Sequence, residues 1–319
     1  MARYLVTGGA GFIGSHLVEA LIDKGHSVRV LDDLSAGRRE NLPPGVELLK
    51  ADIANPSIIG PALLGIDGCF HLAAIASVEQ CNRDWLRTHQ VNLTGAINLF
   101  GAVRQLRSVI DIPIVYASTA AVYGASGGVP AGEDSCATPI SAYGADKRGC
   151  EVHARAAGQA YGLRSVGLRF FNIYGPRQDP HSPYSGVIAV FLDRLRRGEP
   201  VEIFGDGSQV RDFTYVADAV SALMQAMPRA SASAPLFNVC TGQGTTIRRL
   251  AETIAGLCHS ELVAYNRPAR QGDIPISIGD PRRAAEELGF VARTHLLDGL
   301  ARTRDASACG QTFKTRAVA

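Results

Sequence analysis

Tyr143 and Lys147 are two residues whose types and spacing suggest acid–base chemistry. They stand four positions apart, and on a helix this spacing places both side chains on one face. A free tyrosine has a pKa of about 10 and is protonated at neutral pH, whereas a neighbouring ammonium stabilises the phenolate and lowers that pKa. The pair therefore predicts a tyrosine that acts as a general base, with Lys147 as the group that tunes it.

A further hydroxyl is expected close to this pair. The apolar segment 112–118 is typical of a buried strand and runs directly into Thr119. The carboxyl end of a central parallel strand faces the crevice in which such sheets bind ligands. The bland alternative for Tyr143 and Lys147 is a surface tyrosine beside a solvated lysine. The hydroxyl at Thr119, together with the glycine loop at the start of the chain, favours catalysis.

The first turn of the chain predicts a site for a dinucleotide. Residues 5–7 are an apolar run that breaks into glycines and resumes as an amphipathic helix, in the order strand, phosphate loop, helix. Gly8 permits a tight turn, Gly11 lets the backbone approach a pyrophosphate, and Gly14 lets the helix pack on the strand. The glycines fit two registers, one that begins at Gly8 and one that begins at Gly9, and the sequence does not choose between them.

Two carboxylates follow where a ribose would lie. Asp32 and Asp33 end the second apolar run, eighteen residues past Gly14. A carboxylate there accepts hydrogen bonds from an adenosine ribose and repels a 2′-phosphate, which favours NAD over NADP. Arg38 and Arg39 follow closely and are the residues that would favour NADP instead.

The elements that position these groups alternate in type. Short apolar segments alternate with helical stretches as far as residue 171. This pattern is typical of the doubly wound α/β, or Rossmann, architecture, in which a parallel sheet carries helices on both faces. Asp52 and Ile53 follow the third predicted strand, where they would meet the adenine. Ala73 and Ala74 follow the fourth and are small enough to let a cofactor pass.

Beyond residue 171 the regular alternation stops, although the segment 236–240 is typical of a strand that returns to the sheet. We therefore expect two domains. Residues 1–171 and about 207–242 form the NAD-binding domain, about 172–206 and 243–300 form a smaller, discontinuous C-terminal domain for the substrate, and the polar residues 301–319 form a loosely held tail.

The totals exclude several classes of protein. The chain has 319 residues, 46% of them hydrophobic, and a formal net charge of +2 from 32 basic and 30 acidic residues. This length can bury one large core or two smaller ones. The near balance of charge provides no field that would attract nucleic acid or an anionic membrane. We therefore expect neither as a partner.

Cysteine usage and the N-terminus bear on the compartment. The seven cysteines are scattered, odd in number and never spaced C-x-x-C, which argues against a disulfide framework and against a zinc site. The first residues lack the pattern of a secretion signal, and no segment reaches the ~18 apolar residues of a spanning helix. These features predict a soluble cytoplasmic protein without a metal site.

Seven stretches together resemble the NAD-dependent sugar epimerase/dehydratase group of extended short-chain dehydrogenases/reductases. They extend from Gly8 to Asp280, nearly the whole chain, and are TGGAGFIGSH around Gly8, Asp32-Asp33, YASTAAVYG from Tyr116, SAYGADK from Ser141, RFFNIYGPRQDP from Arg169, GDGSQVRDFTYVAD from Gly205 and RQGD from Arg270. The resemblance implies a Rossmann fold, NAD as cofactor and a nucleoside-diphosphate sugar as substrate.

The resemblance also implies roles for individual residues. Tyr143 is the general base, Lys147 also holds the nicotinamide ribose, and Thr119 hydrogen-bonds the reacting oxygen of the sugar. The implied cofactor contacts are Gly8, Gly11, Phe12, Ile13, Gly14, Asp32, Asp33, Asp52, Ile53, Ala73, Ala74, Asn92, Tyr143 and Lys147. The implied substrate contacts are Asn172, Arg211 and Arg270 for the diphosphate, Phe204 for the base and Asp273 for the nucleoside ribose, together with Ser77, Thr119, Tyr143 and Ser277 at the sugar. A planar guanidinium suits phosphate oxygens, which agrees with the two arginines.

The residues after Thr119 bear on the reaction. The related 4,6-dehydratases carry an Asp-Glu pair there, and decarboxylating relatives commonly keep the glutamate, whereas this chain has Ala120 and Ala121. Alanine transfers no proton, so the resemblance implies reversible oxidation and hence a 4-epimerase. The alternatives are a uronate epimerase, a reductase that exchanges NAD(H), and a catalytically silent NAD-binding sensor.

Two serines bear on the sugar. Ser277 matches a position that is small in 4-epimerases accepting N-acetylated sugars, and Ser77 resembles a substrate-contacting serine of the N-acetylhexosamine epimerases. We expect interconversion of UDP-GlcNAc and UDP-GalNAc, with UDP-glucose and UDP-galactose as further substrates; the alternative is a strict UDP-glucose enzyme. The resemblance also implies a homodimer, in which the helix near residues 86–107 and the helix after Tyr143 form a four-helix bundle.

Overall fold

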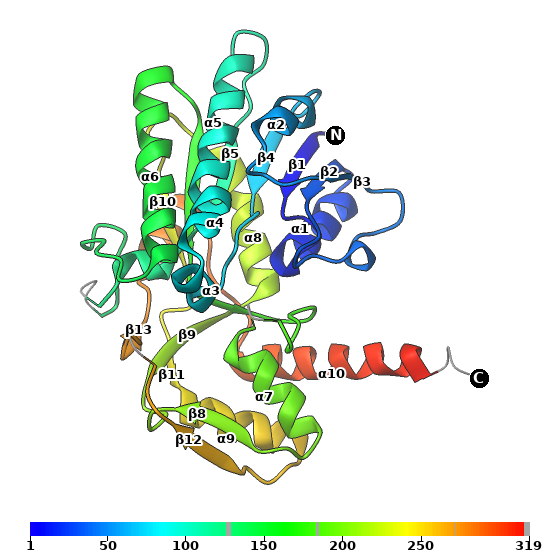
Figure 1. Ribbon diagram of the computed structural model, residues 1–319, viewed down its shortest axis with the longest axis vertical. Coiled ribbons are helices and arrows are strands. Elements are labelled where there is room, and N and C mark those ends of the chain that lie inside the picture. The colour runs from blue at the N-terminus through cyan, green and yellow to red at the C-terminus, as the bar shows by residue number, and fades with distance from the viewer. Residues whose placement is uncertain (126–128, 183–184, 271, 316–319) are drawn as a thin grey trace.

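A sheet of seven parallel strands dominates the computed structural model, which describes residues 1–125, 129–182, 185–270 and 272–315 (Figure 1). Its strand order is β10-β6-β5-β4-β1-β2-β3. The strands are β1 (Arg3–Thr7), β2 (Ser27–Asp32), β3 (Glu47–Lys50), β4 (Gly68–His71), β5 (Ile114–Thr119), β6 (Ser165–Phe170) and β10 (Leu236–Val239). This is the predicted doubly wound α/β architecture, including the returning strand β10.

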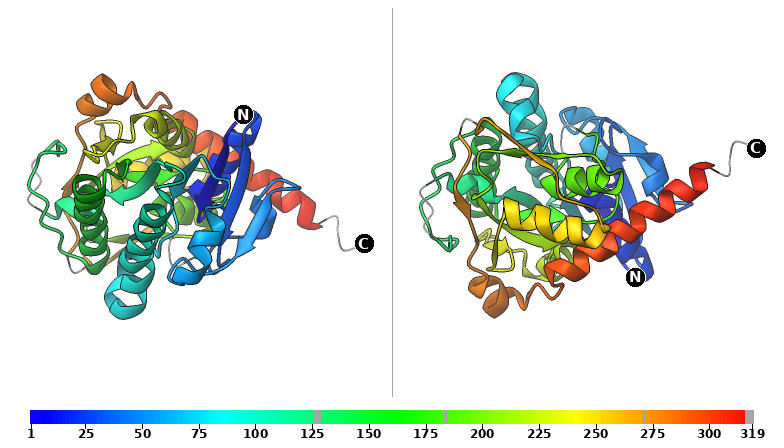
Figure 2. Two further views of the ribbon diagram at one scale, coloured as in Figure 1. Left: turned by 90° about the horizontal axis from the view of Figure 1, so that it is seen from above. Right: turned by 90° about the horizontal axis from the view of Figure 1, so that it is seen from below.

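Helices cover both faces of this sheet, which is why its strands are apolar along their length. The helices are α1 (Phe12–Asp23) and α8 (Val216–Ala226) on one face, and α2 (Pro56–Ala62), α5 (Gly95–Leu106) and α6 (Ala142–Tyr161) on the other. Successive side chains of a strand point to opposite faces, so Val6 lies in the core under α1 and Leu5 in the core under α5. Figure 2 shows α5 and α6 side by side.

The helix predicted near residues 86–107 is present but irregular. It comprises α4 (Trp85–His89), a π-helical turn at Gln90–Thr94 and α5, and it follows the short helix α3 (Val78–Arg83). The remaining short elements are 3₁₀ helices at Arg39–Asn41, Ala120–Tyr123 and Met227–Arg229 and a π-helical turn at Ala284–Leu288.

A smaller part of the molecule lies below the large sheet in Figure 1. It contains β7 (Asn172–Tyr174), α7 (Val187–Arg196), β8 (Val201–Phe204), β9 (Val210–Tyr215), β11 (Gly244–Thr246), α9 (Ile247–Cys258), β12 (Ala264–Arg267) and β13 (Ile276–Ser277). Strand β9 pairs with β7, β11 and β13, and β8 pairs with β12. The sequence placed β9 in the NAD-binding part, but these pairings put it in the smaller one, and the chain rejoins the large sheet at α8.

The C-terminal segment differs from its prediction. Residues expected to be a polar tail from 301 continue a helix, α10 (Leu296–Thr315), which projects from the smaller part of the molecule (Figures 1 and 2). Leu300 and Thr303 are buried and hold its first turns. Alanine and arginine, which are frequent here, have high helix propensity, but the few apolar residues form no helical stripe that the sequence could reveal.

The described residues contain neither a membrane-spanning helix nor a cluster of metal ligands. No helix among them has the length and apolar character needed to cross a membrane. Within the same part of the chain, no three histidine, cysteine, aspartate or glutamate side chains gather as metal ligands would.

Candidate active site

A cavity of about 880 Å³ lies where the strands of the large sheet end. Its walls come from segments that follow the carboxyl ends of β1 to β6, the place where open α/β sheets bind ligands. Fifteen predicted site residues line it: Gly8, Gly11, Phe12, Ile13, Gly14, Asp32, Asp33, Asp52, Ile53, Ala73, Ala74, Thr119, Tyr143, Lys147 and Asn172. The fold thus gathers the predicted cofactor and catalytic residues from six separate strand ends.

Gly8 and Gly14 shape the part of the cavity next to α1. Gly8 has a φ of +68°, and a Cβ there would lie 2.7 Å from the backbone nitrogen of Ala73. A Cβ at Gly14 would lie 2.1 Å from the carbonyl oxygen of Gly8, so neither position accepts a side chain. A Cβ at Gly9 would instead meet the buried Val30. Of the two registers left open by the sequence, the structure therefore supports the one that begins at Gly8, and its cradle fits a pyrophosphate.

Asp32 is held rigidly beside this loop. One carboxylate oxygen accepts a hydrogen bond from the backbone nitrogen of Ala10 at 3.0 Å, and the other accepts one from Leu34 at 2.8 Å. Burial raises the pKa of Asp32, and these two hydrogen bonds oppose the rise. Asp33 is more exposed than Asp32, and its Oδ1 atom accepts a hydrogen bond from the backbone nitrogen of Ser35 at 2.9 Å. The site therefore presents two carboxylates where the ribose was predicted.

Asp52 lies where the adenine of the cofactor was predicted. Its Oδ2 atom is 2.7 Å from the Nη2 atom of Arg87, and both residues line the cavity beside Ile53. The sequence singled out Asp52 and Ile53 but not Arg87, which comes from α4. An arginine on an exposed helix has no local signal that would tie it to a strand end.

Tyr143 stands in the first turn of α6 and lines the cavity together with Thr119. The helix starts there because the Ser141 hydroxyl oxygen accepts a hydrogen bond from the backbone nitrogen of Gly144 at 3.1 Å. Lys147 follows one turn later and is 1% exposed. The structure thus joins the three predicted catalytic residues at one wall of the cavity, from two different elements.

The pKa of Tyr143 differs from its prediction. The sequence predicted that Lys147 lowers the pKa of Tyr143, but in the chain itself burial raises the pKa of the Tyr143 phenol, and the neighbouring Thr119 hydroxyl only partly opposes this rise. Burial likewise lowers the pKa of the Lys147 ammonium. Desolvation disfavours the charged form of each group and here outweighs their proximity on the helix.

Two predicted contacts, Asn92 and Ser77, do not line the cavity. Asn92 is buried, and its carboxamide accepts a hydrogen bond from the Ile75 backbone nitrogen at 2.8 Å and donates one to the Ile75 carbonyl at 3.1 Å. The Ser77 hydroxyl caps α3 by accepting from the backbone nitrogen of Gln80 at 3.1 Å. Since Ile75 and Gln80 themselves line the cavity, Asn92 and Ser77 support its wall rather than contact its contents.

The other predicted substrate residues form a second cluster in the smaller part. The Arg270 guanidinium lies 4.0 Å from the centre of the Phe204 ring. Arg211 Nη2 lies 2.5 Å from Asp273 Oδ1, and Ser277 is the register partner of Arg211 in the β13–β9 pair. The fold therefore brings these five predicted substrate residues together, although they come from three separate stretches of sequence.

Asn172 connects the cluster to the cavity. It lines the cavity, and its side-chain nitrogen donates to the Asp212 carbonyl oxygen, 3.0 Å away, in the strand that carries Arg211. Gln209 belongs to the same cluster and was not predicted: its Nε2 atom donates to the Phe204 carbonyl at 2.7 Å. Its Nε2 atom also lies 3.5 Å from Asp273 Oδ2, and neither contact follows from a spacing in the sequence.

A loop after β7 also lines the cavity and received no role from the sequence. Arg177, Gln178 and Asp179 are part of the wall, and Asp179 forms an ion pair with Arg38 across it. All three residues lie within the stretch RFFNIYGPRQDP, which was one of the seven stretches that carried the family resemblance. That stretch is the feature of the sequence that could have marked them as site residues.

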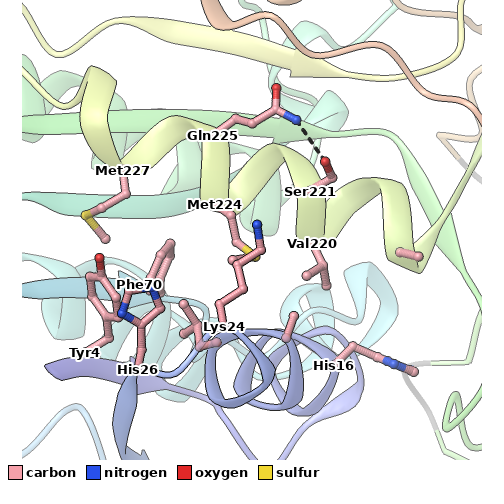
Figure 3. A pocket seen from close by; sticks show the side chains of 13 residues that line it. Tyr4, His16, Lys24, His26, Phe70, Val220, Ser221, Met224, Gln225 and Met227 are labelled. Carbon is pink, nitrogen blue, oxygen red and sulfur yellow. Dashed lines mark hydrogen bonds between the residues drawn. The ribbon is translucent and has the colours of Figure 1, made fainter. Parts of the chain in front are cut away.

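Figure 3 shows another cavity, between α1 and α8. Lys24 extends from α1 toward Met224, and Phe70 and Met227 line its apolar end. This cavity shares no lining residue with the larger one, and none of the predicted site residues borders it. The predicted chemistry is therefore confined to the cavity at the carboxyl ends of the strands.

Most of the chain matches the model of one known family. Residues 4–240, which contain the glycine loop, Thr119 and the Tyr143–Lys147 pair, match the model of the NAD dependent epimerase/dehydratase family. The chain belongs to this family. The epimerase/dehydratase match confirms the resemblance, the Rossmann fold class and NAD as the cofactor predicted from the sequence.

Named relatives in the epimerase/dehydratase family cover nearly the whole chain. UDP-glucose 4-epimerase of Mycolicibacterium smegmatis is 39% identical over 309 residues, which are 94% of this chain and 97% of the relative. The structure of Thermus thermophilus UDP-glucose 4-epimerase in complex with NAD has a TM-score of 0.89 and 37% identity, and covers 95% of this chain and 98% of its own. The structure of UDP-N-acetylglucosamine 4-epimerase from Methanobrevibacter ruminantium in complex with UDP-N-acetylmuramic acid has a TM-score of 0.89 and 35% identity. The match covers 97% of this chain and 99% of the relative.

Proposed function

We propose that this chain is an NAD-dependent UDP-sugar 4-epimerase, an isomerase that inverts C4 through a transient 4-keto sugar. The observation that carries the proposal is that Thr119, Tyr143 and Lys147 meet at the wall of one cavity, which the glycine turn at Gly8 also lines. Ala120 and Ala121 follow Thr119, so the site has groups for reversible oxidation but not for removal of water from the sugar. The names of the three relatives support the same reaction.

In this proposal the large sheet holds NAD. The turn at Gly8 and the N-terminus of α1 receive the pyrophosphate, Asp32 receives the adenosine ribose, and Asp52 receives the adenine. When bound, NAD supplies reversible hydride transfer with C4 of the sugar. Epimerisation leaves the redox state unchanged, so the protein has no need to release its cofactor between turnovers.

Tyr143 removes and returns the proton of the 4-hydroxyl. In this proposal the hydroxyls of Tyr143 and Thr119, which both line the cavity, contact the same sugar oxygen and so orient the reacting group. Burial raises the pKa of Tyr143, so its phenolate is a strong base once formed. Lys147, one turn away and buried, supplies the positive charge that stabilises the phenolate during proton transfer.

The smaller part of the chain is proposed to hold the UDP moiety. Arg211 and Arg270 are cations that suit the two phosphates, while Phe204 offers a ring face to the uracil. In the structure Arg270 stacks on Phe204 and Arg211 pairs with Asp273. Substrate binding would exchange these internal contacts for contacts with phosphate, base and ribose.

For the sugar, we propose UDP-GlcNAc and UDP-GalNAc. Ser277 is a small residue beside Arg211 in the β13–β9 pair, which leaves room for an N-acetyl group near the phosphates. The relative from M. ruminantium is named for UDP-N-acetylglucosamine. The second candidate is UDP-glucose and UDP-galactose, which is favoured by the names of the relatives from M. smegmatis and T. thermophilus.

The test uses purified protein without added cofactor, incubated separately with UDP-GlcNAc and with UDP-glucose, and separation of the 4-epimers by chromatography. Conversion of UDP-GlcNAc supports both the 4-epimerase reaction and the room for an N-acetyl group beside Ser277. Conversion of UDP-glucose alone supports the 4-epimerase reaction but contradicts the proposed room for an N-acetyl group. Ser277→Tyr should then abolish turnover of the acetylated sugar while leaving that of UDP-glucose. If neither sugar reacts even with NAD supplied, the proposed function is wrong.

A further inference from the structure

Glu151 and Arg169 form a buried ion pair beneath the catalytic wall. The exposed fractions of their side chains are 1% and 2%. Glu151 Oε1 accepts from Arg169 Nε at 2.8 Å, and Glu151 Oε2 accepts from Arg169 Nη2 at 2.8 Å, a two-pronged contact. Each group holds the other in its charged form: the arginine lowers the pKa of Glu151 against its burial, and the carboxylate raises the pKa of Arg169.

This ion pair joins three elements of the large sheet. Glu151 comes from α6, Arg169 from β6, and the Ser118 hydroxyl of β5 donates to Glu151 Oε1 at 2.6 Å. Ser118 and Arg169 are register partners in the β5–β6 pair. One carboxylate therefore fixes the helix to two neighbouring strands at a single level.

The Nη1 atom of Arg169 makes two further hydrogen bonds. It donates to the Tyr123 hydroxyl at 2.9 Å and to the Glu133 carbonyl oxygen at 3.0 Å. The guanidinium carbon lies 4.8 Å from the centre of the Tyr123 ring. Tyr123 ends the 3₁₀ turn that follows Thr119. Arg169 therefore contacts the chain on both sides of Thr119, because it bonds Tyr123 directly and is linked to Ser118 through Glu151.

The same residues flank the catalytic group. Tyr143, Lys147 and Glu151 follow one another at intervals of four on α6, so they share one helix face. Ser118 directly precedes Thr119 on β5. We propose that Glu151 and Arg169 are positioning residues of the reaction, which hold Tyr143 and Lys147 on α6 in register with Thr119 on β5. This inference rests on the proposed function.

Stability alone does not explain a charged pair at this place. Burying two charges carries a large desolvation penalty, and well-packed apolar residues of similar volume hold a fold equally well or better. What apolar residues lack is direction: a bidentate contact between a guanidinium and a carboxylate fixes how the two planar groups face each other. Arg148 also contacts Glu151 Oε2, at 2.8 Å, but it is 40% exposed and lies on α6 itself, so it ties the helix to no strand.

The test replaces both charges, as Glu151→Leu with Arg169→Met, and uses Arg148→Met as the matched control. We expect the double variant to fold, its kcat to fall at least about tenfold, and its KM for the nucleotide sugar to stay within about twofold. The control should keep the kcat of the original protein. A double variant with unchanged kcat overturns the inference.

A second readout does not depend on turnover. Tyrosinate difference absorbance of the NAD-loaded protein, measured against its Tyr143→Phe counterpart, reports the titration of Tyr143. In the double variant this titration should move to higher pH, because Lys147 no longer lies in a fixed place beside the phenol. The shift supports the inference even if the original protein epimerises no sugar, and an unchanged titration contradicts it.

Ser118→Ala covers the case in which the double variant fails to fold. It removes one hydrogen bond to Glu151 and leaves the ion pair intact. We expect a severalfold lower kcat in a protein that remains folded, with a melting temperature lowered by only a few degrees. If Ser118→Ala keeps the full kcat while the double variant is unfolded, Glu151 and Arg169 serve the fold only.

Discussion

Arg211 and Asp273 form an ion pair in the smaller sheet, with Nη2 and Oδ1 2.5 Å apart. Both were assigned to substrate, one to the diphosphate and one to the ribose. Burial lowers the pKa of Arg211, and Asp273 opposes that effect. The pair thus keeps a partly buried cation ready where the nucleotide is proposed to bind.

Removal of this cation should weaken substrate binding rather than the chemical step. Hydrogen bonds to charged groups contribute about 1.5–3 kcal/mol, so Arg211→Met is expected to raise KM for the UDP-sugar about 10- to 100-fold with little change in kcat. Arg249→Met, at an arginine that is 73% exposed on α9, is the control and should leave KM unchanged. Steady-state kinetics measure both, and an unaltered KM in Arg211→Met would refute the assignment.

Tyr143→Phe tests the general base. Loss of a positioned base lowers rates by about 100- to 10,000-fold, so kcat should fall by that order while NAD remains bound. Tyr265→Phe, at a tyrosine that is 57% exposed, should behave like the original protein. Near-normal turnover in Tyr143→Phe would sink the assignment of the base.

The pH dependence of kcat follows from two opposite shifts. Burial raises the pKa of Tyr143 and lowers the pKa of Lys147. The Lys147 ammonium is therefore lost at a lower pH than that at which the Tyr143 phenol ionises, while the fraction of phenolate grows as the pH rises. We expect kcat to increase from neutral pH until Lys147 loses its proton and then to level off. Initial rates across a pH series measure this profile, and a maximum in acid would contradict it.

A homodimer is the fourth prediction. Leu86, Ile97 and Val152 are exposed by 70%, 37% and 54% on α4, α5 and α6, and apolar side chains gathered on neighbouring helices are typical of an interface. Light scattering should give twice the mass of one chain. Replacing Leu86 and Ile97 by aspartate should give the monomer, whereas Val263→Asp, at a site that is 45% exposed in the smaller part, should not. A monomer in the original protein would exclude the four-helix bundle.

The cofactor half of the site could be predicted because its signals are local. Gly8, Gly14 and Asp32 lie in one strand–turn–helix–strand unit, whose geometry follows from short-range sterics. Tyr143 and Lys147 are likewise set by helix periodicity. The structure adds what these patterns leave open, namely that Gly8 rather than Gly9 begins the loop, since Gly9 faces the core.

Features that depend on tertiary packing could not be predicted in this way. Asn92 has the right residue type for a cofactor contact, but the fold turns its carboxamide to Ile75. The raised pKa of Tyr143 depends on burial, which no spacing reports. The strand β9 joined the smaller sheet, and α10 replaced a predicted tail, because each is fixed by partners distant in sequence.

Proton exchange at C4 tests the central claim most directly. The protein is incubated with UDP-GlcNAc, and in parallel with UDP-glucose, in deuterated water without added cofactor, and the products are examined by NMR. The account predicts inversion at C4 with the original hydrogen retained on that carbon, since a hydride that leaves C4 and returns to it never exchanges with water. A product that carries deuterium at C4, or no inversion of either sugar, would contradict it.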